Sequence, residues 1–207
     1  MKRIPTLILA FGMALSALNT PTNAQSPVSV PKLAVALATA TPQNQAVVPV
    51  RYRFATGQQF SVYLTGYSFW DNTPPGSAAI AKPVIRQRAG GTGTHKDPIT
   101  LAVGHSFATG RQVLDFPPGT RFYFPALRRY AIVEDVCGDG NSPQNGPCHT
   151  GHKGLPWIDI YVDGRKSGRG AANACMNRIT GIHDVIVNPP ANLPVQRGAL
   201  TESGCST

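Results

Sequence analysis

The chain has 207 residues and a formal net charge of +9, with 19 Lys and Arg residues against 10 Asp and Glu residues. This length fits one medium-sized domain with a leader rather than two full domains. The basic side chains are scattered and no nucleic-acid-binding motif accompanies them, so we expect no nucleic-acid partner. The excess positive charge favours anionic surfaces such as acidic polysaccharides, or serves solubility alone.

A targeting segment is predicted at the N-terminus. Lys2 and Arg3 precede a short apolar stretch over residues 7–18, and the small residue Ala24 suits a cleavage site. The stretch is shorter than the roughly 20 residues that span a bilayer, so we expect cleavage and no stable membrane insertion. We therefore predict a signal peptide over residues 1–24 and a secreted protein, either periplasmic or extracellular.

Residues 25–57 are predicted to form a Pro- and Ala-rich arm or linker, because they carry little charge and no sustained period. From residue 58 onward, short segments alternate between apolar and polar residues and are separated by turn-forming residues. The expected strands are FSVYLTGYS from Phe60, a short one over 80–85, ITLAV from Ile99, RFYFP from Arg121, RRYAIVED from Arg128, WIDIYV from Trp157 and VIVN from Val185. One short helix is expected over GAANACMNRITG, residues 170–181.

Many short strands with one helix argue for a small barrel and against a parallel α/β sheet. We predict an all-β fold, a small barrel over residues 58–207 with one short helix and loops tied by disulfides.

The four cysteines all lie in the C-terminal third of the chain: Cys137, Cys148, Cys175 and Cys205. An exported chain meets an oxidising compartment, where an even number of cysteines normally pairs. Three connectivities are possible. We favour Cys137 with Cys148, which closes a loop rich in Gly, Asn and Pro, and Cys175 with Cys205, which ties the tail to the body.

Several other chemistries are disfavoured. A zinc site needs closer cysteines, and His149 and His152 lack a neighbouring ligand that would complete a set. A serine hydrolase elbow of the form GxSxG is missing from the sequence, and the GGTGT run lacks the GK[ST] ending of a phosphate loop. We expect no metal and no cofactor.

Three aspartates, Asp97, Asp135 and Asp159, lie within or against apolar, strand-like runs. Burial disfavours a charged carboxylate and raises its pKa, and such carboxylates serve as general acids near neutral pH. In WIDIYV, the alternation places Asp159 opposite the aliphatic face. Glu134 and Asp135 are expected to face opposite sides of their strand.

Four sequence elements follow one another along the chain: Asp97-Pro98, Pro118-Gly119-Thr120, Glu134-Asp135 with Gly138, and Ile158-Asp159-Ile160-Tyr161. Their order resembles the three-aspartate domain of the double-psi β-barrel group, which includes the catalytic part of membrane-bound lytic transglycosylase A. The resemblance covers roughly residues 63–162 and implies a six-stranded double-psi barrel. The GGTGT, DPIT and FYFP segments also resemble a set of secreted fungal and bacterial proteins.

The resemblance to the lytic transglycosylase implies roles for the three aspartates. Asp135 would protonate the glycosidic oxygen and then help the sugar's own hydroxyl to close an anhydro product. Asp159 would raise the pKa of Asp135 by like-charge repulsion. Asp97 would brace its loop or bind sugar hydroxyls.

The segment GYSFWD, which ends at Asp71, is similar to the RYWD-type motif of family-45 endoglucanases, whose barrel is shared by expansins. This likeness implies hydrolysis with Asp159 as acid and Asp71 as base, roughly 6.5 to 9.5 Å apart. Asn72 and Thr73 stand where those enzymes have cysteines.

Aromatic residues near these acids are candidates for stacking on sugar rings, with core packing as the alternative. They are Tyr67, Trp70, Trp157 and Tyr161. The acids also have a structural alternative: Asp97 caps a turn, Glu134 and Asp135 pair with Arg128 or Arg129, and Asp159 is solvated.

We predict a secreted monomer that acts on a wall polysaccharide, anionic or neutral, by lytic transglycosylation or hydrolysis. An expansin-like protein that binds or loosens glycan without cleaving it is the alternative. A secreted interaction or inhibitor protein is a third hypothesis.

Overall fold

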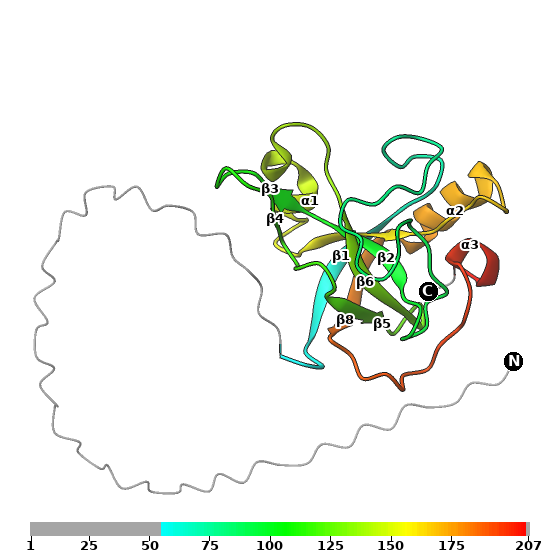
Figure 1. Ribbon diagram of the computed structural model, residues 1–207. Coiled ribbons are helices and arrows are strands. Elements are labelled where there is room, and N and C mark those ends of the chain that lie inside the picture. Colours follow the sequence, from blue (N-terminus) through cyan, green and yellow to red (C-terminus); the bar gives the residue numbers. More distant parts are fainter. Residues whose placement is uncertain (1–54, 206–207) are drawn as a thin grey trace, which may run out of the picture. The chain divides into compact units, whose positions relative to one another are not determined.

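The structure is a computed structural model that describes residues 55–205 (Figure 1). The signal peptide predicted over residues 1–24 and nearly all of the arm predicted over 25–57 lie outside the described residues.

Eight strands and three α-helices are found in this part of the chain. The strands are β1 (Gln59–Tyr67), β2 (Ile99–Val103), β3 (His105–Ser106), β4 (Val113–Leu114), β5 (Arg121–Phe124), β6 (Arg129–Val136), β7 (Trp157–Tyr161) and β8 (Gly181–Val187). The α-helices are α1 (Pro147–Thr150), α2 (Arg169–Ile179) and α3 (Leu200–Ser203), with a 3-10 turn over Pro143–Asn145 before α1.

Six of the strands close into a barrel in the order β1-β7-β2-β6-β5-β8. The pairs β1–β7 and β2–β6 are parallel, whereas the other neighbouring pairs are antiparallel. The short strands β3 and β4 form a separate sheet. The predicted all-β, six-stranded barrel is confirmed.

The alternation along the strands decides which side chains fill the barrel. Val62 and Leu64 of β1, and Ile158 and Ile160 of β7, are fully buried on one face. The residues between them lie on the outer face, where β1 and β7 align residue by residue, Thr65 beside Asp159. Because the side-chain period of a strand is two, the inward set of aliphatic residues fixes the outward position of Asp159.

The strand expected over residues 80–85 is wrong, because this segment is a loop. Its backbone N–H groups do not form a strand pairing. Lys82 N–H donates to the Glu134 carbonyl, and the amides of Val84 and Ile85 donate to the Glu134 side chain. The single predicted helix corresponds to α2, and the structure adds the four-residue helices α1 and α3.

Both favoured disulfides are present. Cys137 pairs with Cys148 and Cys175 with Cys205, with Cα–Cα distances of 5.8 Å and 5.3 Å, which suit disulfide bonds. Within residues 55–205, we find no helix of the length and apolar character needed to cross a membrane.

Candidate functional site

A pocket of about 360 Å³ opens on the outer face of the barrel wall. Its lining comes from β1, β2, β6 and β7, from the loop that follows β1, and from the loop that follows β6. Three aspartates predicted from the sequence, Asp71, Asp135 and Asp159, all line it, together with Tyr67. A fourth carboxylate, Asp139, also lies in the wall and was not predicted. The structure therefore brings acids from distant parts of the chain into one accessible cavity.

The strand register explains how two of these acids meet. Ala102 of β2 pairs with Asp159 on one side and with Asp135 on the other. Neighbouring strands are about 4.8 Å apart, so the backbones of the two aspartates are about 10 Å apart. The small side chain of Ala102 lines the pocket between them. This arrangement leaves room for a ligand between two carboxylates.

A β-bulge in β6 selects which of two consecutive acids faces the pocket. Leu101 pairs with Val133, but the next residue, Ala102, pairs with Asp135, so Glu134 is the extra residue. Without the bulge, Glu134 would lie beside Ala102. Bulges re-aim side chains in this way and are frequent next to active sites. The expected opposition of Glu134 and Asp135 is found.

Asp159 is the most perturbed carboxylate of the pocket. Its pKa is raised to about 7, chiefly by burial; the hydrogen bond from Thr65 lowers it, and the charges of Asp71 and Asp135 add to the rise. Thr65 Oγ1 donates to Asp159 Oδ1 at 3.0 Å, and Thr65 itself accepts from Trp157 Nε1 at 2.7 Å. This partly buried carboxyl therefore keeps its proton to a higher pH than an exposed aspartate.

Asp135 is only 6% exposed and is held by three donors. Its Oδ1 accepts from the backbone N–H groups of Ala81 and Val136, each at 2.9 Å, and its Oδ2 accepts from the Tyr67 hydroxyl at 2.9 Å. Burial raises the pKa of Asp135, and these three hydrogen bonds work against that rise. Because both oxygens already accept hydrogen bonds, Asp135 is better suited to remain a fixed negative charge than to deliver a proton.

Asp71 is exposed at the start of the loop that follows β1. Its Oδ1 accepts from the backbone N–H and the hydroxyl of Ser68, at 2.7 and 2.8 Å. These contacts orient the carboxylate toward the pocket while Oδ2 accepts no hydrogen bond from residues 55–205. None of the ion pairs found in that range involves Asp71, Asp135 or Asp159.

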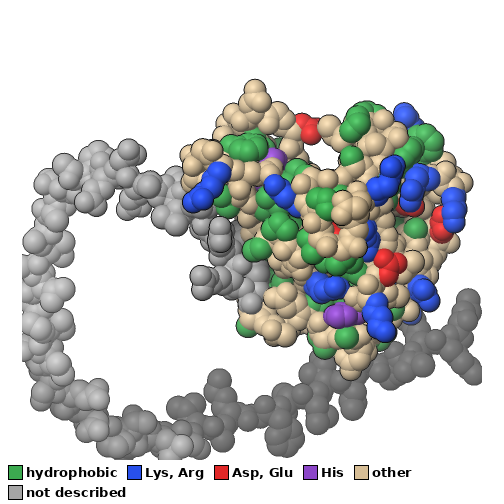
Figure 2. All heavy atoms as spheres, in the orientation of Figure 1, with side chains coloured by type: hydrophobic (Ala, Val, Ile, Leu, Met, Phe, Trp, Pro, Cys, Tyr) green, Lys and Arg blue, Asp and Glu red, His purple; other side chains and the backbone are tan. Residues whose placement is uncertain are grey.

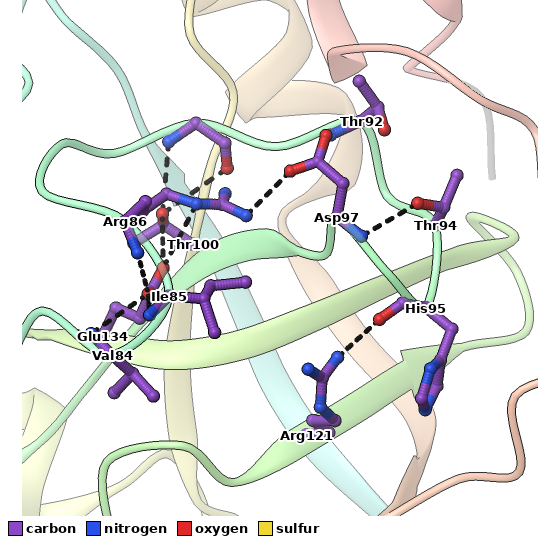
Figure 3. Close-up of polar contacts among 11 residues, drawn as sticks. Val84, Ile85, Arg86, Thr92, Thr94, His95, Asp97, Thr100, Arg121 and Glu134 are labelled. Carbon is purple, nitrogen blue, oxygen red and sulfur yellow. Dashed lines mark hydrogen bonds and ion pairs between the residues drawn. The ribbon is translucent and has the colours of Figure 1, made fainter.

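Glu134 and Asp97 act in a polar clamp behind the pocket. The fully buried Glu134 accepts from the backbone N–H groups of residues 84–86 through Oε1, and its Oε2 lies 3.6 Å from the Arg86 guanidinium. The same guanidinium donates to Asp97 at 2.9 Å. Figure 3 shows Arg86 between the two carboxylates. This clamp holds the loop whose Ala81 N–H reaches Asp135.

Asp97 does not line the pocket, and of its two predicted roles its contacts match the bracing of its loop rather than the binding of sugar hydroxyls. Besides Arg86, it accepts from the Thr92 N–H at 2.9 Å, and its own N–H donates to Thr94, so it orders its turn. The alternative that Glu134 pairs with Arg128 or Arg129 is also wrong. Arg129 is buried and donates to the Leu127 carbonyl and to the Ser203 hydroxyl.

Of the four predicted aromatic residues, Tyr67 alone lines the pocket. Tyr161 is buried and packs edge-on against the Tyr67 ring, with ring centroids 5.2 Å apart. Trp157 contacts the site indirectly through Thr65, and Trp70 donates from Nε1 to the Gly164 carbonyl at 3.0 Å. Three of the four are thus neighbours of the pocket wall rather than part of it.

The loop closed by Cys137 and Cys148 forms one pocket wall, through Cys137, Gly138 and Asp139. His105 anchors it, because its Nε2 donates to the Gly138 carbonyl at 3.0 Å. At the other end of the loop, His149 contacts Asp115 at 2.6 Å. His149 thus ties the end of this loop to Asp115, and no group of three His, Cys, Asp or Glu side chains suited to a metal ion is found in residues 55–205.

Comparison with known proteins places this barrel in a family. Residues 59–206 match the model of the family described as the DDB_G0273701 N-terminal domain, which covers β1 to the tail. The "Uncharacterized protein DDB_G0273701/DDB_G0273221" of Dictyostelium discoideum is 35% identical over 88 residues, which are 42% of this chain and 35% of that protein. The chain thus spans about a third of the length of this curated relative. No solved structure matches.

The family match extends over most of the chain and contains every residue of the pocket. The protein therefore belongs to the DDB_G0273701 N-terminal domain family.

Proposed function

We propose that this protein is a secreted enzyme that cleaves glycosidic bonds in a wall polysaccharide, with the aspartates of the pocket as its catalytic groups. The observation that carries the proposal is the meeting of Asp71, Asp135 and Asp159 in one open cavity, with no Lys or Arg in its lining. Glycoside hydrolysis needs an acid for the leaving oxygen and a base for water, and two carboxyl groups supply both.

The environments of the three acids support different roles. Asp159, with its pKa raised to about 7, is the general acid and donates its proton to the glycosidic oxygen as the bond to the anomeric carbon breaks. Asp71 is the base that takes a proton from the attacking water, whose oxygen forms the new bond to that carbon. Asp135, fixed by three hydrogen bonds, stabilises positive charge that develops on the sugar ring.

This assignment favours hydrolysis over lytic transglycosylation by Asp135. In the lytic mechanism, Asp135 must carry and then recover a proton, yet both of its oxygens already accept hydrogen bonds. The double-psi form of the barrel and secretion belong to the same proposal. The closed six-stranded barrel with two parallel pairs supports the first, and the two disulfides, typical of oxidising compartments, support the second.

The test is the release of fragments from purified glycans, including peptidoglycan and neutral and anionic plant-wall polysaccharides, followed by mass spectrometry. Products of hydrolysis contain one added water, whereas lytic products do not. Asp159→Asn and Asp71→Asn are each expected to lower the rate about 100-fold or more, because each removes a proton-transfer group. Wild-type activity is expected to fall above pH 7, where Asp159 loses its proton.

The matched control is Asp184→Asn, because Asp184 is an exposed aspartate on β8 that does not line the catalytic pocket. It should retain wild-type activity. If wild-type protein binds glycan but releases no fragment, the protein is a binding module of the expansin type, and the catalytic proposal is rejected.

A further inference from the structure

Basic side chains lie near the pocket and around the N-terminus of α2. Arg165 precedes the helix, Arg169 is its first residue, and Arg88 lies in the loop between β1 and β2; all three are exposed. Figure 2 shows Lys and Arg side chains concentrated on the side of the molecule that carries α2. We call Arg88, Arg165 and Arg169 the basic strip.

Arg165 and Arg169 each contact a residue near the pocket. Arg165 donates to both oxygens of Asp163, at 2.6 and 2.9 Å. Burial and the charge of Asp163 raise the pKa of Tyr161, and the charges of Arg165 and Arg88 act in the opposite direction. The guanidinium of Arg169 lies 5.7 Å from the centre of the Trp70 ring, within cation–π range.

The strip continues from the proposed catalytic pocket. Trp70 immediately precedes Asp71, which lines the pocket. Tyr161 packs edge-on against Tyr67, another lining residue. Trp70 also donates to the Gly164 carbonyl, which joins the loop after β1 to the segment before α2. A polymer that places one sugar in the pocket therefore has neighbouring sugars within reach of the strip.

Ion pairs within the described fold do not account for Arg88 and Arg169. The positive end of the helix dipole lies at the N-terminus of α2, where cations are unfavourable, and the first turn holds no acidic residue. Asp163 neutralises the charge of Arg165 but forms no ion pair with Arg88 or Arg169. In residues 55–205, neither Arg88 nor Arg169 forms an ion pair. Unpaired arginines of this kind suit a ligand that carries carboxylate or sulfate groups, because the guanidinium fork binds such oxyanions through two hydrogen bonds.

We propose that the substrate is an anionic glycan and that the basic strip binds acidic groups on the sugars next to the cleavage point. The inference rests on the proposed function for the position of the cleaved bond. It names the chemical class of the substrate, a polysaccharide with an acidic group on successive sugars. A neutral glycan makes no charged contact with the strip and binds more weakly.

The test measures binding apart from cleavage, with the full chain in an Asp159→Asn background that prevents turnover. Polygalacturonate is the carboxylate probe, heparin the sulfate probe, and amylose the neutral probe, each titrated at low and at physiological salt. We expect Arg88→Gln combined with Arg169→Gln to weaken polygalacturonate or heparin binding about tenfold, since each exposed charge pair contributes a few-fold. Binding of amylose should not change, and the preferred anion identifies the acidic group.

The control variant, Arg111→Gln with Lys153→Gln, removes the same net charge at two exposed residues outside the strip. It should change binding less than twofold. The inference is overturned if both double variants lose affinity equally, if neither does, or if single-stranded DNA binds more tightly than either anionic glycan. Failure of the proposed function has a different signature: wild-type protein then releases no fragments, while the strip variants still lose anionic binding.

Discussion

At the scale of single residues, the pocket shows how one side-chain type acquires three properties from its surroundings. Asp159 lies half-buried with a single hydrogen-bond donor, Asp135 is buried with three, and Asp71 is exposed and oriented by Ser68. The pKa of Asp159 is raised to about 7 because one hydrogen-bond donor only partly offsets the effect of its burial. The assignment of acid and base therefore follows from the number of hydrogen bonds and the degree of burial.

The raised pKa of Asp159 also makes a prediction about stability. The pKa is about 7 in the folded protein and near 4 in the unfolded chain. The unfolded state therefore releases this proton first, and the stability associated with protonated Asp159 is complete below about pH 4 and is lost as the pH rises through 7. Asp159→Asn, which cannot ionise, should escape this loss.

We expect thermal and urea unfolding to show Asp159→Asn equal to wild type at pH 4 and more stable at pH 8, by about 1 to 3 kcal/mol once partial exposure of the carboxylate is allowed for. Asp184→Asn, the exposed control, should follow wild type at both pH values. Equal stabilities of Asp159→Asn and wild type at pH 8 would show that this carboxylate is not perturbed by the fold.

At the scale of elements, the bulge in β6 and the loop before β2 depend on each other. The bulge turns Glu134 away from the pocket, and Glu134 then binds the backbone N–H groups of residues 84–86. The loop held in this way delivers the Ala81 N–H to Asp135. One irregularity in a strand therefore positions both a carboxylate of the pocket and one of its hydrogen-bond donors.

Glu134→Gln tests this connection. The substitution leaves the partly buried Arg86 with Asp97 alone and weakens the buried acceptor for three N–H groups, so we expect a loss of about 2 to 4 kcal/mol in the free energy of unfolding. Amide hydrogen exchange at residues 84–86 should accelerate. The control is Glu202→Gln, whose exposed partner Lys166 is 3.9 Å away and whose removal should cost less than about 0.5 kcal/mol. Unchanged exchange at residues 84–86 would contradict the clamp.

The same elements show how far the sequence could predict the site. Strict alternation in FSVYLTGYS and WIDIYV was enough to place β1, β7 and the outward face of Asp159. The bulge was not predictable, since a local pattern does not reveal which residue of a neighbouring strand is skipped. The strand expected at 80–85 was also wrong because of distant contacts. The amides of Val84 and Ile85 donate to the Glu134 side chain, 50 and 49 residues away, rather than to the backbone of a neighbouring strand. The sequence around Ala102 did not mark it as part of a site, because its role comes from its two paired residues, Asp135 and Asp159.

At the scale of the whole molecule, the two disulfides serve different purposes. Cys175–Cys205 joins α2 to the C-terminal tail, which Arg129 also holds through Ser203. Cys137–Cys148 closes the loop that forms a pocket wall, and Cys137 itself lines the pocket. The tail disulfide therefore contributes to global stability, whereas the loop disulfide contributes to the shape of the site.

This division predicts opposite rankings in two measurements. A disulfide stabilises chiefly by restricting the unfolded chain, and more so for a longer loop. With sequence separations of 30 and 11 residues, replacing both cysteines by alanine should cost about 4 kcal/mol for Cys175–Cys205 and about 3 kcal/mol for Cys137–Cys148 in urea unfolding. Glycan cleavage at a temperature where both variants remain folded should show the reverse order. Loss of the loop disulfide frees Gly138 and Asp139 from their places in the pocket wall, while loss of the tail disulfide alters no lining residue. Equal activity of the two variants would show that the 137–148 loop keeps its shape through His105 and His149 alone.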